Sequence, residues 1–262
     1  MRQPIVTLTT DFGLADHFTG AMKGVILSIE PRARIVDISH EIAPYSIPEA
    51  AFVLAQAYRC FPAGTVHVAV VDPGVGTSRR PILAEAARQF FVAPDNGVLS
   101  MVYAQEKHKV RAVTRGAFFR KPVSQTFHGR DVFAPVAAHL AHGVEAARFG
   151  KLISDYVRGD FAEPVSRGEL GWTGCILKVD RFGNLITNFA SAGFPDLDRR
   201  AFEMRVGRQH VTACLVNYAQ GKPRQLFAIA GSSGFLEIAA NQGSAAKLTG
   251  SAAGAKVSLV MK

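Results

Sequence analysis

The first half of the chain alternates short apolar runs with longer amphipathic stretches. Apolar, often β-branched runs predict strands at residues 5–8, 33–38, 66–71 and 90–93. Amphipathic stretches predict helices at residues 19–29, 47–60 and 132–141. The run at 66–71 is almost wholly apolar, as in a strand covered on both faces. This alternation predicts an N-terminal α/β domain with a mainly parallel sheet.

The pattern changes after about residue 143. A polar connection at 154–168 leads to short strand-like runs at 174–179, 185–189, 202–206, 227–229, 235–238 and 257–260. Glycine, asparagine and aspartate turns separate these runs, and long helical periodicity is absent. We therefore predict two domains, an α/β domain at 1–158 and a smaller C-terminal β-barrel domain at 169–262.

Charge and cysteine usage narrow the class of protein. The 262 residues carry a formal net charge of +9, but the basic residues are scattered, which does not favour a nucleic-acid partner. The three cysteines are widely spaced and predict neither a disulfide framework nor a metal site. The chain begins with a strand-like run and has no apolar stretch of membrane-spanning length. We expect a cytoplasmic protein without a membrane partner.

Two acidic residues follow the first predicted strand, in the string TTDFGLAD. Asp11 and Asp16 lie five residues apart in one loop, where carboxylates can bind hydroxyl groups or an ammonium group. Either acid alone is equally well explained as the cap of the next helix. The carboxyl ends of strands in parallel sheets are where ligands bind, so this loop is a candidate site.

A second string, VVDPGVGTSRR, follows the buried strand at 66–71. Asp72 comes directly after that strand, and one proline and two glycines then predict a tight loop whose backbone can approach a ligand. The string is neither a dinucleotide-binding fingerprint nor a phosphate-binding loop. A plain turn followed by two surface arginines remains the alternative.

The other candidate strings are weaker when each is taken alone. In FHGRD, His128 and Asp131 precede a predicted helix, and Asp131 is also explained as its cap. No histidine pair has the spacing of a zinc site, so no metal is expected. In the second half, DRFGNLITN and GSSGFLEIAAN each resemble an ordinary hairpin.

Taken together and in this order, the five strings resemble the S-adenosyl-L-methionine hydroxide adenosyltransferases, the water-using relatives of fluorinase and chlorinase. The likeness covers nearly the whole chain. It implies an α/β N-terminal domain, a β-barrel C-terminal domain, and a homotrimer with sites between subunits. It also implies that Asp72, Arg79 and His128 surround the attacking water.

The same resemblance implies the substrate contacts. Asp11 would bind the ribose hydroxyls, with Tyr45 against the ribose. The methionine portion would meet Asp16, Asp180, Asn184 and Ser232, and the adenine would lie near Phe235 and Asn241. Ser233 departs from the arginine that fluorinase has beside the methionine carboxylate, and the resemblance assigns no role to Gln242.

The resemblance implies hydrolysis of S-adenosyl-L-methionine to adenosine and methionine, without a cofactor. Physical reasoning from the residues leaves open whether Asp72 or His128 accepts the proton from water. Gly129 replaces a serine of the halide-using relatives, so water is the expected nucleophile. Two alternatives are a nucleoside-binding protein without turnover and a metal-dependent hydrolase that uses Asp11, Asp72 and His128.

Overall fold

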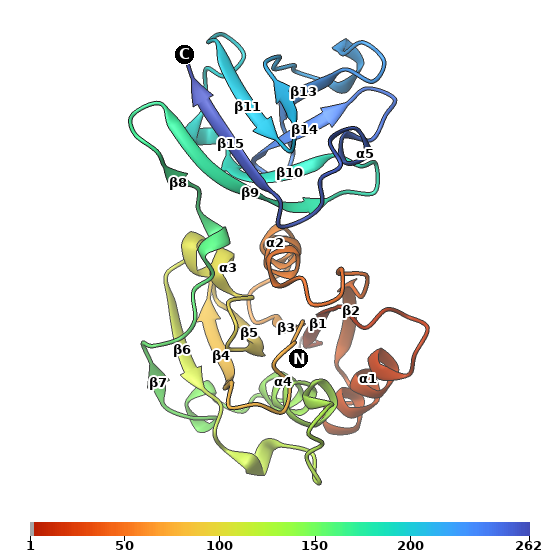
Figure 1. Ribbon diagram of the computed structural model, residues 1–262. Coiled ribbons are helices and arrows are strands. Elements are labelled where there is room, and N and C mark those ends of the chain that lie inside the picture. Colours follow the sequence, from red (N-terminus) through yellow and green to blue (C-terminus); the bar gives the residue numbers. More distant parts are fainter. Residues whose placement is uncertain (1–2) are drawn as a thin grey trace. The chain divides into compact units, whose positions relative to one another are not determined.

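The computed structural model describes residues 3–262 of the chain (Figure 1). These residues form two compact units that divide between Gly159 and Asp160. Within residues 3–262, no helix is both long enough and apolar enough to cross a membrane.

The N-terminal unit contains one seven-stranded sheet and four α-helices. The strands are β1 (Ile5–Thr10), β2 (Arg34–Ser39), β3 (Val66–Val70), β4 (Pro81–Ala86), β5 (Gln89–Pro94), β6 (His108–Ala112) and β7 (Leu152–Ile153). The helices are α1 (Phe18–Ile29), α2 (Ile47–Ala57), α3 (Ser100–Gln105) and α4 (Ala134–Ala141). The α/β class is as predicted.

The sheet is parallel in one half and antiparallel in the other. Its order is β2-β1-β3-β5-β4-β6-β7, and the pairs among β2, β1, β3 and β5 are parallel. The pairs from β5 to β7 are antiparallel, and β4, β6 and β7 had not been predicted. The turn between β4 and β5 uses Ala87 and Arg88 with positive φ, where asparagine and glycine usually signal a hairpin. This hairpin therefore lacks its usual sequence signal.

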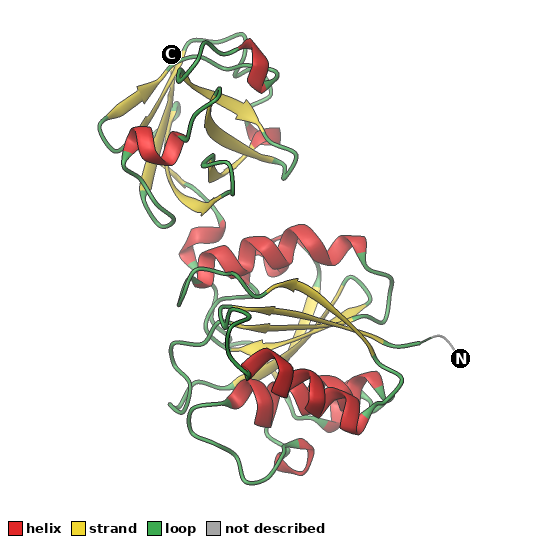
Figure 2. Ribbon diagram, turned by 90° about the vertical axis from the view of Figure 1, so that its right-hand side faces the viewer, coloured by secondary structure: helices red, strands yellow, loops and turns green. Residues whose placement is uncertain are grey.

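Two apolar cores cover the two faces of this sheet. Figure 2 shows helices on both faces. Along the third strand, Val66, Val68 and Val70 pack with residues of α1 and α4, whereas Ala69 and Val71 pack with residues of α2 and α3. Alternate side chains of a strand point to opposite faces, so a strand buried on both faces has a nearly continuous apolar run. This explains the sequence pattern at 66–71.

The predicted helix at 132–141 begins differently in the structure. A π-helical turn occupies Gly129–Phe133, and α4 follows from Ala134. Pro135 lies in the first turn of α4, where its missing N–H is tolerated. This wider turn begins directly after His128, at the entrance to the helix.

The C-terminal unit is a nearly closed antiparallel barrel. Its main strands run in the order β12-β11-β15-β9-β10-β14-β13. The elements are β8 (Val165–Ser166), β9 (Gly171–Val179), β10 (Leu185–Ala190), β11 (Phe202–Val206), β12 (Gln209–Val211), β13 (Leu226–Ala230), β14 (Phe235–Ala240), α5 (Ala245–Thr249) and β15 (Lys256–Met261). Beyond β12, Ala228 of β13 bonds to Ala213 and Leu215, which brings the two ends of the sheet together.

A histidine is buried in the α/β unit within a polar network. His67 Nδ1 is 2.7 Å from Thr7 Oγ1, and His67 Nε2 is 3.2 Å from Gln89 Oε1. The Gln89 amide nitrogen donates to backbone carbonyls, so its oxygen accepts the proton on Nε2. Burial lowers the pKa of His67 to about 4.

This burial predicts a pH dependence of stability. Below about pH 6.5 the unfolded chain binds a proton at His67 that the folded chain does not bind, so the free energy of unfolding falls by about 3 kcal/mol down to pH 4. We expect His67→Gln, which cannot titrate, to show a shallower fall when urea unfolding is followed by circular dichroism across this range. Parallel pH curves for both proteins would contradict this assignment.

Candidate active site

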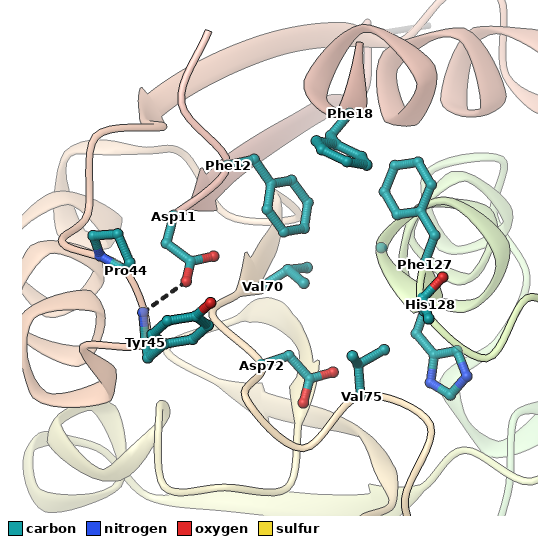
Figure 3. A pocket seen from close by; sticks show the side chains of 12 residues that line it. Asp11, Phe12, Phe18, Pro44, Tyr45, Val70, Asp72, Val75, Phe127 and His128 are labelled. Atoms are coloured by element: carbon teal, nitrogen blue, oxygen red, sulfur yellow. Dashed lines mark hydrogen bonds between the residues drawn. The ribbon is translucent and has the colours of Figure 1, made fainter. Parts of the chain in front are cut away.

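Two carboxylates meet at one edge of the α/β sheet. Asp11 follows β1, and Asp72 lies two residues beyond the end of β3. Because β1 and β3 pair in parallel, their carboxyl ends lie at the same edge. Figure 3 shows both carboxylates in a pocket of about 360 Å³. This is the edge at which the sequence predicted a site.

Aromatic side chains form one wall of this first pocket. The ring centroids of Phe12, Phe18 and Phe127 lie 5.1 to 6.0 Å apart. On the other side, Tyr45 is exposed and has a positive φ of 66°. Its backbone N–H donates to Asp11 Oδ2 at 2.9 Å, as Figure 3 shows. The carboxylate of Asp11 is thereby fixed beside an open aromatic ring.

Arg79 links Asp72 to His128. Its Nε donates to Asp72 Oδ1 at 2.9 Å, and its Nη2 donates to Asp72 Oδ2. The same Nη2 lies 2.7 Å from His128 Nδ1. The Asp72 and Arg79 side chains are only 5% and 9% exposed. The three residues that the resemblance grouped therefore form one connected, largely buried chain.

Burial and neighbouring charges shift two of the pocket's acid–base groups. Burial raises the pKa of Asp11, and the Tyr45 N–H opposes this rise. Burial lowers the pKa of His128, and the neighbouring Arg79 guanidinium lowers it further. His128 is therefore neutral near pH 7, so the positive charge beside Asp72 comes from Arg79.

The remaining N-terminal residues singled out from sequence lie differently. Tyr45 lines the pocket, as do Asp11, Asp72 and His128. Asp16 is exposed and is not among the lining residues. Arg79 bonds to Asp72 and does not itself line the pocket. Its guanidinium carbon lies 5.2 Å from the centroid of the Phe133 ring.

The C-terminal unit carries a second pocket, of about 700 Å³. Six residues named from the sequence line it, namely Asp180, Asn184, Ser232, Ser233, Asn241 and Gln242. Asp180 accepts the backbone N–H of Asn184 at 2.8 Å and also its side-chain amide at 2.8 Å. Phe235 is buried and does not line this pocket.

Phe182, Tyr218 and Glu237 also line this second pocket and were missed from sequence. Phe182 is 78% exposed within the DRFGN hairpin. An apolar ring in a turn was the sequence signal that could have identified it. Glu237 is buried, and Tyr218 donates a hydrogen bond to it at 3.1 Å. Burial raises the pKa of Glu237. Glu237 lies within the apolar run of β14. The alternation of polar and apolar residues along a strand does not by itself identify it as a pocket residue.

Metal ligands are not clustered in the described part of the chain. Within residues 3–262, no group of three or more histidine, cysteine, aspartate or glutamate side chains is arranged to bind a metal ion. The three cysteines are all free.

The chain matches known proteins along nearly its whole length. Models of the SAM hydroxide adenosyltransferase N-terminal and C-terminal domains match residues 6–150 and 174–258. An (R)-S-adenosyl-L-methionine hydrolase from Salinispora tropica is 39% identical over 94% of both chains. A fluorinase from an Actinoplanes species is 30% identical over 71% of both chains.

A solved structure shows the same fold. The crystal structure of an uncharacterized conserved protein from Thermotoga maritima superposes with a TM-score of 0.86 and 38% identity, over 98% of this chain and 99% of that one. The family models match one unit each, and the fold and the order of motifs agree with them. The chain belongs to the S-adenosyl-L-methionine hydroxide adenosyltransferase family.

Proposed function

We propose that this protein hydrolyses S-adenosyl-L-methionine to adenosine and L-methionine. The observation that carries this proposal is the hydrogen-bonded chain of Asp72, Arg79 and the half-buried His128 at the edge of a pocket with an aromatic wall. Relatives that match over nearly their full length are named (R)-S-adenosyl-L-methionine hydrolases. A protein that only binds a nucleoside has no use for this acid–arginine–histidine chain.

The proposed reaction is a displacement at the ribose C5′. The water oxygen forms a bond to C5′, the bond from C5′ to the sulfonium sulfur breaks, and methionine leaves as a neutral thioether. The leaving group needs no acid, so the enzyme acts on the water. Alignment of the water in a desolvated pocket supplies up to about 7 to 11 kcal/mol. A positioned base adds about 100- to 10,000-fold.

We assign acceptance of the water proton to Asp72. An arginine side chain only donates hydrogen bonds, so the contact at 2.7 Å requires His128 Nδ1 to be the acceptor. A neutral His128 then carries its proton on Nε2 and has no free site for another. A carboxylate accepts several hydrogen bonds at once, so Asp72 can bind Arg79 and water together. His128 positions the Arg79 guanidinium by accepting its hydrogen bond, and Arg79 in turn positions the Asp72 carboxylate.

The other pocket residues bind the substrate in this proposal. Asp11, already fixed by Tyr45, accepts the ribose hydroxyls, and Tyr45 lies against the ribose. The methionine portion meets Asp180, Asn184 and Ser232, with Asn241 near the adenine. Asp16 and Phe235 keep their proposed contacts with methionine and adenine, although neither lines a pocket here. Water and substrate supply the whole reaction, so no cofactor is proposed.

We further propose a cytoplasmic homotrimer with active sites between subunits. Each site would combine the α/β pocket of one subunit with the barrel pocket of another. The support is that residues proposed for one substrate are divided between two pockets in separate units. The proposed number of three subunits comes from the family resemblance.

Water is preferred over a halide because of the packing at Gly129. A Cβ at this position would lie 3.2 Å from Met22 Sδ and 3.3 Å from both Phe12 Cε2 and Phe127 Cε2. A serine at this position would require these side chains to shift by a few tenths of an ångström. The carboxylate of Asp72 also repels an anion but accepts a hydrogen bond from water.

Incubation with S-adenosyl-L-methionine in oxygen-18 water tests this function. With fluoride and chloride present, we expect mass spectrometry to show adenosine labelled at its 5′-hydroxyl, formed at the same rate in EDTA. The Asp72→Ala protein, purified identically, controls for contaminating enzymes. Binding without product would favour a nucleoside-binding protein, loss of activity in EDTA a metal-dependent hydrolase, and a 5′-halogenated nucleoside a halide-using enzyme.

A further inference from the structure

Asp131 is a buried carboxylate that the proposed chemistry does not use. Its side chain is fully buried and accepts four hydrogen bonds. Oδ1 accepts from Arg130 Nε at 2.7 Å and from Arg120 Nη1 at 3.1 Å. Oδ2 accepts from Arg130 Nη2 at 2.8 Å and from the Ser124 N–H at 2.9 Å. A buried charge is costly unless it is paired in this way.

These bonds hold a loop segment, residues 120–127, against the π-helical turn that contains Asp131. The backbone of Asp131 adds two bonds, because its carbonyl accepts the Arg120 N–H at 2.9 Å and its N–H donates to the Phe127 carbonyl at 3.2 Å. Arg130 also lies over the Phe127 ring at 5.0 Å. His128 is the residue between this segment and the turn, so its backbone is fixed from both sides.

The same segment fits closely against the loop that carries Asp72 and Arg79. Gly76 has a φ of +77°, and a Cβ there would overlap the Gln125 carbonyl oxygen. Directly after this segment, His128 Nδ1 lies 2.7 Å from Arg79 Nη2. A shift of the segment therefore changes the contact between His128 and Arg79 directly.

We propose that Asp131 is a positioning residue that keeps His128 Nδ1 against Arg79 and so keeps Arg79 on Asp72. The catalytic consequence of this inference rests on the proposed function, whereas its geometric part does not. Arg120 and Arg130 neutralise Asp131, and the bonds of its carboxylate to Arg120 and to the Ser124 N–H hold the segment.

The charges around His128 determine in which direction its pKa changes if the proposal is correct. Burial and the neighbouring Arg79 lower the pKa of His128, whereas Asp72, Asp131 and a backbone hydrogen bond with Ser124 raise it. Removing the charge of Asp131 without movement would therefore lower the pKa of His128 further. Releasing His128 from Arg79 and from its buried place would raise that pKa toward 6.5.

Nitrogen-15 NMR of histidine-labelled protein tests this directly, with His128 assigned by His128→Gln. In the parent protein we expect a neutral ring with its proton on Nε2. In Asp131→Asn we expect mixed tautomers and a raised pKa of His128. Single-turnover adenosine formation should fall about 100-fold, with little change in the dissociation constant for adenosine.

Glu30→Gln is the matched control. Glu30 is also a fully buried carboxylate, bonded to Arg32 and His142 near the ends of α1 and α4. This variant should leave the tautomer of His128 and the single-turnover rate unchanged. If Asp131→Asn does not fold, Arg120→Gln should move the same NMR signals in the same direction by less.

An unchanged Nε2–H tautomer in Asp131→Asn, or a lowered pKa of His128, would overturn the positioning role. An equal response in Glu30→Gln would also overturn it, because the effect would then be a general loss of structure. The NMR measurement needs no turnover, so its outcome is independent of the proposed hydrolysis.

Discussion

Asp72→Asn is expected to lower the single-turnover rate of adenosine formation by about 1,000-fold. The amide has the shape of the carboxylate and still accepts a hydrogen bond from Arg79, but it cannot take a proton from water. Asp72 contacts the attacking water and not the adenosyl group of the substrate. The dissociation constant for S-adenosyl-L-methionine, measured by calorimetry, should therefore change little.

Two variants of neighbouring residues test whether this loss of rate is specific to Asp72. Asp11→Asn should show the opposite pattern, a weaker affinity for adenosine with a smaller effect on rate, because Asp11 is proposed to bind the ribose hydroxyls. His128→Gln keeps an oxygen that can accept from Arg79, so it should retain more turnover than Asp72→Asn. Equal losses in His128→Gln and Asp72→Asn would instead support His128 as the base.

Mixed oligomers of Asp72→Ala and Asn184→Ala chains are expected to regain activity from near zero. In oligomers of only one variant, every site contains one damaged pocket. If each site joins pockets of two subunits, every trimer that contains both chains has one intact site in about three. The measurement is adenosine formation by oligomers that carry two different tags after co-expression and two-step purification.

A second mixture controls for the handling of the chains. Asp72→Ala and Arg79→Ala both damage the same α/β pocket, so their mixed oligomers should stay inactive. No recovery with Asn184→Ala, together with sedimentation as a monomer, would contradict the shared site.

Local patterns predicted much of the fold. The almost wholly apolar run at 66–71 became β3, buried on both faces, and the short runs after residue 170 became barrel strands. The antiparallel half of the N-terminal sheet was missed because its hairpin turns at Ala87 and Arg88, which carry no usual turn signal. Side-chain type did not reveal that backbone conformation.

The candidate site was predicted from the ends of strands. Asp11 and Asp72 follow β1 and β3, and parallel pairing of these strands brings them to one edge. Phe182 and Glu237 were missed, because neither a ring in a hairpin nor an acid within a strand by itself identifies a pocket residue. Their exposure and neighbours depend on how the barrel closes.

The sequence by itself determined the class of fold, the family and the set of candidate residues, because strand periodicity, turn residues and motif order are local properties of the chain. Only the tertiary structure decided which atoms meet. Arg79 and His128 are 49 positions apart, and their bond, which places the histidine proton on Nε2, depends on the close fit of two loops. Long-range contacts of this kind are made by packing, which no local pattern encodes.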